Sequence, residues 1–243
     1  MQEKIPHGHS ENLHQTDHGL YISDLVYGSN DGIITTFAVV SGAAGAALTT
    51  ETIIILGLAS LVADGISMGI SNYLAISSRL DYQKQERRRE EFEVDNFPEK
   101  ERSEVREILE RWGIPERYME ETLTSITSDK TRWVDLMMKE ELGIFEDKIE
   151  SPSKHGLVTM GAFVIAGSLP LTPYLFGVNA DSQFIVSIIA TASSLFVVGS
   201  ARTYLTGAKW FQSGLQMLLV GSAAAASAYL VGALVKNFFG IMI

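Results

Sequence analysis

The strongest constraint in this sequence is the separation of its apolar residues from its charged residues. The segment Arg79–Lys154 holds 15 of the 19 lysine and arginine residues. About 20 apolar residues are needed to cross the lipid core of a membrane as a helix. With its flanks, each of five apolar runs is long enough, so we predict an all-α membrane protein with five transmembrane helices. The runs are Gly32–Leu48, Thr52–Ile76, Gly156–Val178, Phe184–Ala201 and Gly214–Phe239.

The composition excludes several classes of function. The chain has no cysteine, which rules out disulfides, zinc sites with cysteine ligands and iron–sulfur clusters. Its net charge of −10 argues against nucleic acid as a partner, because phosphate binding needs a basic face. Residues 1–20 form a polar tail without the basic and apolar parts of a signal peptide. We expect this tail to be disordered, with incidental metal affinity from His7, His9, His14 and His18.

The placement of basic residues predicts the orientation in the membrane. The segment 79–154 and the loop that carries Arg202 and Lys209 are basic, whereas the two loops expected on the other side have no lysine or arginine. The positive-inside rule therefore places the N-terminus and 79–154 in the cytoplasm and the C-terminus outside. The expected domains are the tail 1–20, transmembrane helices 1–2 in 21–78, a cytoplasmic Glu-rich helical domain in 79–154, and transmembrane helices 3–5 in 155–243.

The segment between spans two and three is predicted to be helical. Span two continues without a breaker to the Asn96-Phe97-Pro98 turn. Pro98 suits a first helical turn, and Gly113 suits the end of that helix. Another helix follows over 116–127. Asp129 is a plausible N-cap for a third helix, which Gly143 ends. We therefore expect a three-helix domain inserted between spans two and three.

Acidic residues within the apolar runs are the first candidates for chemistry. A carboxylate at lipid depth costs several kcal/mol and normally faces a cavity, a partner or an ion path. Asp31 lies early in span one, and Asp64 lies in the middle of span two. Helical spacing places Ser60, Asp64, Met68 and Asn72 on one stripe, which offers oxygen ligands and one thioether. The alternative interpretation is that Asp64 bonds a neighbouring helix and Met68 only packs.

A second candidate group lies in the central segment. The pairs Glu90 and Glu93, and Glu101 and Glu104, each place two carboxylates on one helical face. Met137, Met138 and Glu141 add thioethers beside another carboxylate. Spacing alone favours a solvated helix face, with nearby arginines pairing the glutamates, and only suggests a metal site.

Several motifs resemble the vacuolar iron transporter (VIT) family, and the resemblance runs from Ile22 to the C-terminus. They are Asp24-Leu-Val-Tyr-Gly-Ser-Asn-Asp-Gly32, Ile66-Ser-Met-Gly69, the Glu-rich helices around Pro98, Trp133-Val-Asp-Leu-Met-Met-Lys-Glu-Glu-Leu-Gly143 and Pro170-Leu-Thr-Pro-Tyr174.

The resemblance implies a five-span protomer in a homodimer, with an ion path between the subunits. It implies exchange of iron(II) (Fe2+) for protons, often with acceptance of manganese(II). It places Asp31 and Met68 in the path. It assigns the cytoplasmic metal ligands to Glu90, Glu93, Glu101, Glu104, Met137, Met138 and Glu141. Ser60 stands where some eukaryotic members have a glutamate, and Asp64 is one turn away on the same face.

The sequence thus predicts transport of divalent metal ions out of the cytosol by proton exchange, with Asp31 and Asp64 binding ion and proton in turn. We expect no prosthetic group and no enzymatic activity. The host membrane would be the plasma membrane of a prokaryote or the vacuolar membrane of a eukaryote. A manganese(II) exporter with little iron activity is the main alternative. A metal sensor would not need deep acidic groups, and a ferroxidase would normally carry Glu-x-x-His, which the loop before His155 does not contain.

Overall fold

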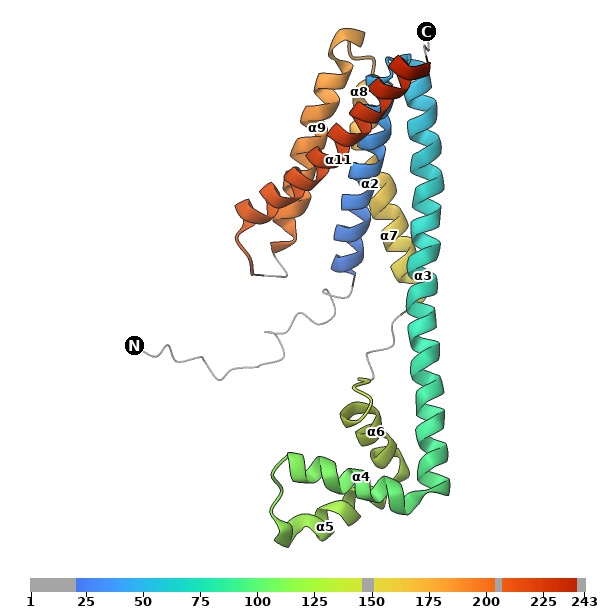
Figure 1. Cartoon of the computed structure of the whole chain (residues 1–243), viewed down its shortest axis with the longest axis vertical. Helices are drawn as coiled ribbons and strands as arrows, with labels where there is room; N and C mark the ends of the chain where they lie inside the picture. The colour runs from blue at the N-terminus through green and yellow to red at the C-terminus, as the bar shows by residue number, and fades with distance from the viewer. Residues whose placement is uncertain (1–20, 146–150, 204–206, 240–243) are drawn as a thin grey trace, which may run out of the picture. The chain divides into compact units, whose positions relative to one another are not determined.

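A computed structural model describes residues 21–145, 151–203 and 207–239 (Figure 1). The histidine-containing tail 1–20 lies outside the described residues. All regular structure in the described part is helical, as predicted. The chain divides into two compact units. Unit 1 contains residues up to 73 and from 153 onward, and unit 2 contains residues 74–152.

Unit 1 contains the helices that are long and apolar enough to cross a membrane. Four such helices are found among the described residues, and they match the last four apolar runs. The first is α3 (Thr50–Asn96), whose first part belongs to this unit. The second is the continuous segment of α7 (Pro152–Gly167), η2 (Leu169–Leu171) and α8 (Thr172–Leu175). The third and fourth are α9 (Ala180–Ala201) and α11 (Trp210–Phe239).

The helix α2 (Ile22–Gly45) covers the first predicted span but is not one of these four. It has 24 residues, or about 36 Å of helix, so its length is sufficient. Its polar side chains, among them Asp24, Asn30 and Asp31, lower the hydropathy of its first half. Four helices therefore have the length and hydropathy expected of a membrane span, and a membrane-crossing α2 stays a prediction.

Contacts in unit 1 depend on glycine where helices approach closely. A Cβ atom on Gly69 of α3 would lie 2.9 Å from the carbonyl oxygen of Gly156 in α7, and a Cβ on Gly156 would lie 2.6 Å from that of Gly69. A Cβ on Gly32 of α2 would overlap the carbonyl oxygen of Phe163. Such small residues let helix backbones pack directly on one another in membranes. They bring α2, α3 and α7 together.

Unit 2 consists of the second part of α3 with α4 (Pro98–Arg111), α5 (Glu116–Thr127) and α6 (Lys130–Glu140). The predicted helix ends are present. Pro98 begins α4, and the side chain of Asp129 accepts a hydrogen bond from the backbone N–H of Arg132 at 3.1 Å, which caps α6. Gly113 and Gly143 follow their helices with φ of +75° and +65°, where glycine carries no steric penalty.

An apolar core holds the helices of unit 2 together. Fully burying one large apolar side chain stabilises a fold by about 1.5–3 kcal/mol. This core contains both methionines that the sequence singled out as candidate ligands. Its buried members are Val94, Val105, Ile108, Leu109, Met119, Leu123, Trp133, Val134, Met137 and Met138.

Candidate metal sites

Three carboxylates from distant parts of the chain meet in unit 2. Glu90 on α3, Glu101 on α4 and Glu141 after α6 each offer one oxygen, and these oxygens lie within 4.8 Å of one another. The side chain of Glu101 is 0% exposed and that of Glu90 is 3% exposed, whereas Glu141 is exposed. We call these three residues the glutamate cluster. Its spacing is suited to one shared cation.

The glutamate cluster is short of hydrogen-bond donors. One oxygen each of Glu90, Glu101 and Glu104 is buried without a hydrogen-bond partner in the described structure. Burying a carboxylate without a partner is costly, so these oxygens favour a bound cation. The ammonium group of Lys100 supplies part of the positive charge that these carboxylates need. It lies 3.3 Å from Glu101 and 2.9 Å from Glu104. Lys100 was not predicted from the sequence, although its position beside Glu101 and four residues before Glu104 was a usable signal.

The acidity of the cluster reflects burial and mutual repulsion. Burial, followed by the nearby charges of Glu141 and Glu101, raises the pKa of Glu90 to about 7. Burial, followed by the charge of Glu104, also raises the pKa of Glu101 and of Glu141. Hydrogen bonds to Glu104 and Glu101 raise the pKa of Lys100 above its usual range. A divalent cation would favour the ionised carboxylates, so binding the ion should release protons.

Metal affinity should therefore rise with pH through neutrality. With a pKa of about 7, the ionised fraction of Glu90 increases roughly 25-fold between pH 5.5 and pH 7.5. We expect the affinity for Mn2+ to rise by at least that factor, as measured by isothermal titration in buffers of different ionisation enthalpy. Without metal, the folded pKa of Glu90 lies above its unfolded value, so its contribution to stability should fall as pH rises from about 4.5 to 7. An affinity that does not change over this pH range would contradict the prediction.

The other ligands predicted for this segment lie in the same unit. Glu93 and Glu104 are half-buried, and the charges of both act on Glu90. Met137 and Met138 are almost fully buried in the core of the unit. Their sulfur atoms as metal ligands stay a prediction.

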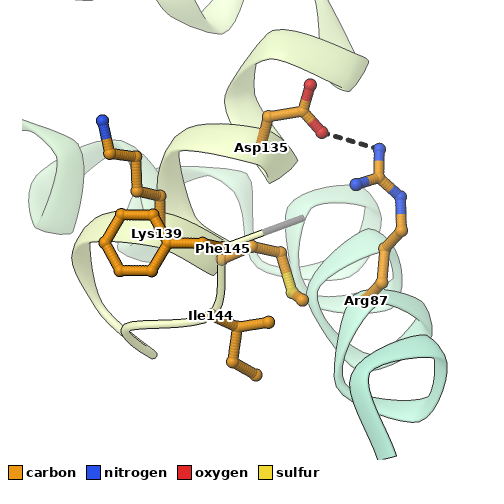
Figure 2. Close-up of a pocket in the computed structure, with 6 residues that line it drawn as sticks. Arg87, Asp135, Lys139, Ile144 and Phe145 are labelled. Atoms are coloured by element: carbon orange, nitrogen blue, oxygen red, sulfur yellow. Dashed lines mark ion pairs between the residues drawn. The ribbon is translucent and has the colours of Figure 1, made fainter. Parts of the chain in front are cut away.

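An ion pair fixes α3 against α6 within unit 2. A pocket of about 300 Å³ is lined by Arg87, Asp135, Met138, Lys139, Ile144 and Phe145 (Figure 2). In it the guanidinium of Arg87 lies 2.7 Å from the carboxylate of Asp135. Arg87 precedes Glu90 by one helical turn, so this contact helps to hold Glu90 near the end of α6. The two cationic side chains make the pocket itself unsuited to a metal ion.

In unit 1, the two predicted acidic residues lie near each other. Asp31 on α2 and Asp64 on α3 are both half-buried, and their charges interact. The hydroxyl of Ser60 donates a hydrogen bond to Asp64 at 2.6 Å, as the helical stripe predicted. The hydroxyl of Thr35 donates to the backbone carbonyl of Asp31 at 2.7 Å. Two carboxylates and the hydroxyl of Ser60 thus gather between α2 and α3, and Met68 is half-buried on the same α3 stripe.

Asn72, the last member of the stripe, belongs to a buried polar group that the sequence analysis did not predict. Its amide nitrogen donates to Asp24 at 2.8 Å and to the hydroxyl of Thr159 at 2.7 Å. The Nδ1 atom of His155 lies 2.5 Å from the other oxygen of Asp24. These four side chains tie α2, α3 and α7 together. Asp24 is the first residue of the motif that runs from Asp24 to Gly32, and it lies seven residues before Asp31 on the same helix. That position was the sequence signal that could have indicated its role.

Comparison with known proteins decides the family. The profile of the VIT family matches residues 22–233, which include every candidate site residue described above. The chain belongs to the VIT family. It is 34% identical to "Vacuolar iron transporter" of Centaurea cyanus over 90% of each chain. It is 34% identical to "Vacuolar iron transporter 1" of Eucalyptus grandis, over 87% of this chain and 85% of the relative. It is 30% identical to "Vacuolar iron transporter 1" of Arabidopsis thaliana, over 90% and 88% respectively. These VIT family relatives are named as transporters, not as enzymes.

Proposed function

We propose that this protein carries divalent transition-metal ions across a membrane, iron(II) first and manganese(II) second. The ions leave the cytosol in exchange for protons. Asp31 and Asp64 bind the ion in the path, with Ser60 and Met68 beside them. Asn72 lines the cytoplasmic end of the same stripe, where it holds α3 to α2 and α7.

The pairing of Asp31 with Asp64 carries this proposal. Asp64 stands in the apolar part of α3, and Asp31 stands on α2, which the sequence predicts as a span. An unneeded carboxylate at lipid depth is costly. A cation and a proton compete for the same carboxylate oxygens, because each neutralises the charge. That competition is sufficient for coupled exchange. The names of the VIT relatives support iron as the substrate.

The remaining parts of the chain fit the same function. The glutamate cluster, with Glu93, Glu104, Met137 and Met138, collects metal ions on the cytoplasmic side and supplies them to the path. Two copies form a homodimer in the plasma membrane or the vacuolar membrane of the host. In one chain, α3 leaves large apolar side chains such as Ile55, Val62 and Ile66 exposed, and a second copy together with lipid would cover them.

The test is transport by the full chain reconstituted in liposomes that contain a metal-sensitive dye and a pH-sensitive dye. We expect uptake of Fe2+ and Mn2+ with proton movement in the opposite direction, and none in protein-free liposomes. Because the two metals are compared under the same gradient, Mn2+ uptake without Fe2+ uptake would favour the manganese exporter. Uptake of neither metal would contradict transport, and uptake without proton movement would contradict exchange.

A further inference from the structure

An acidic pocket opens on the surface of unit 2 between α4 and the end of α6. It has a volume of about 600 Å³. Four carboxylates and one guanidinium line it, so its charge is strongly negative. The lining residues are Glu107, Glu110, Arg111, Glu140 and Glu141. Glu107 and Glu110 are exposed, and neither is one of the metal ligands proposed above.

The pocket connects to the glutamate cluster through Glu141. This residue lines the pocket, and its carboxylate also lies within 4.8 Å of those of Glu90 and Glu101. Glu90 and Glu101 themselves are buried, and each has one oxygen without a hydrogen-bond partner. An ion that arrives from solvent therefore meets the cluster at its exposed member. Glu90 and Glu101, which hold the unpartnered buried oxygens, do not line the pocket.

We propose that this acidic pocket is the entrance through which hydrated divalent cations reach the glutamate cluster. Glu107 and Glu110 attract the ion while it still holds its water. Glu141 then replaces the first water molecules, and Glu101 and Glu90 complete the coordination. This proposal rests on the metal-binding role of the glutamate cluster proposed above. It adds Glu107 and Glu110, which raise the rate at which the ion associates but do not coordinate it in the final site.

Simple electrostatics supports this division of roles. Negative charge in a concave site raises the local concentration of cations and increases association rates by about 10- to 1,000-fold in favourable cases. The attraction energy is twice as large for a divalent ion as for a monovalent one, and salt screens it, with a Debye length of about 10 Å at 0.1 M. A direct ligand behaves differently, since its loss accelerates dissociation at any ionic strength. The two roles can therefore be separated by kinetics.

A tryptophan hydrogen-bonded to one of the lining residues can serve as an optical reporter. The indole N–H of Trp112 donates to the carboxylate of Glu140 at 3.3 Å. Trp112 is half-exposed, so an ion that enters beside Glu140 should change its fluorescence. Stopped-flow mixing of the full chain in detergent with Mn2+ measures association, and mixing of the loaded protein with excess chelator measures dissociation.

Glu107→Gln combined with Glu110→Gln should lower the association rate constant at least about fivefold in 20 mM salt and leave dissociation unchanged. The difference should nearly disappear in about 0.5 M salt, because screening removes the attraction. Glu107→Asp combined with Glu110→Asp keeps the charge and should keep the wild-type rate. The matched control, Glu116→Gln with Glu121→Gln, removes two charges from α5 outside the pocket and should have little effect.

Three outcomes would contradict the proposal that this pocket is the entrance. Equal association rates in wild type and the glutamine variant would show that the pocket does not guide the ion. Faster dissociation that persists in high salt would make Glu107 and Glu110 ligands instead. An equal slowing in the α5 control would assign the effect to net charge. If wild type itself binds no Mn2+, the metal-binding role fails as well, which distinguishes that failure from failure of the entrance alone.

Discussion

Replacing Asp31 by asparagine is expected to slow metal uptake into liposomes by about 100-fold or more. Asparagine keeps the size of the side chain and one oxygen, but it removes the charge that holds a divalent ion at lipid depth. A loss of about 2.7 kcal/mol of ion binding is sufficient for this factor. The measurement is the initial rate of Fe2+ uptake at equal protein density, together with the accompanying proton flux.

The control for this change is Asp181→Asn, which alters an exposed aspartate in the first turn of α9. It should retain the wild-type rate. Thermal unfolding of the Asp31→Asn protein in detergent distinguishes a folding defect from a transport defect. A correctly folded Asp31→Asn protein that carries iron at the wild-type rate would remove Asp31 from the path.

Replacing Glu90 and Glu101 together by glutamine is the second change with a large expected effect. We expect the affinity of the full chain for Mn2+ to fall by about 100-fold or more, because two of the three clustered carboxylates are lost. The melting temperature without metal should rise, since glutamine removes two buried carboxylates that repel each other and that each have one oxygen without a donor. The increase in melting temperature on adding metal should disappear.

Isothermal titration and thermal unfolding measure both parts of this prediction. Glu99→Gln with Glu121→Gln is the matched control, because it removes two exposed carboxylates from the same unit. A metal site would be ruled out at the glutamate cluster if the Glu90 and Glu101 variant kept the wild-type affinity. Lower affinity combined with lower metal-free stability would instead indicate that the two side chains are needed for the fold.

Local sequence signals were sufficient for much of the fold. Runs of apolar residues, Pro98 as a helix start, Asp129 as a cap and Gly113 as a helix end each act within a few residues of the chain. The helices begin and end where these signals predicted, because each signal depends only on neighbouring residues. The first span is the exception, since the polar side chains of α2 weaken the signal in its own sequence. The helix α2 is held by packing against α7, α9 and α11, and that packing is not encoded in the sequence of α2 alone.

The amino-acid sequence alone determined that the chain is helical, that its apolar and charged parts are separate, and which carboxylates are out of place in an apolar helix. Only the tertiary structure decided that Glu90, Glu101 and Glu141 share one site, that Lys100 lies against it, and that Asp24 meets His155. Helical periodicity relates residues three or four positions apart, but it carries no information about which faces of distant helices meet. That choice follows from packing, because burying the core of unit 2 and the close glycine contacts of unit 1 brings those faces together.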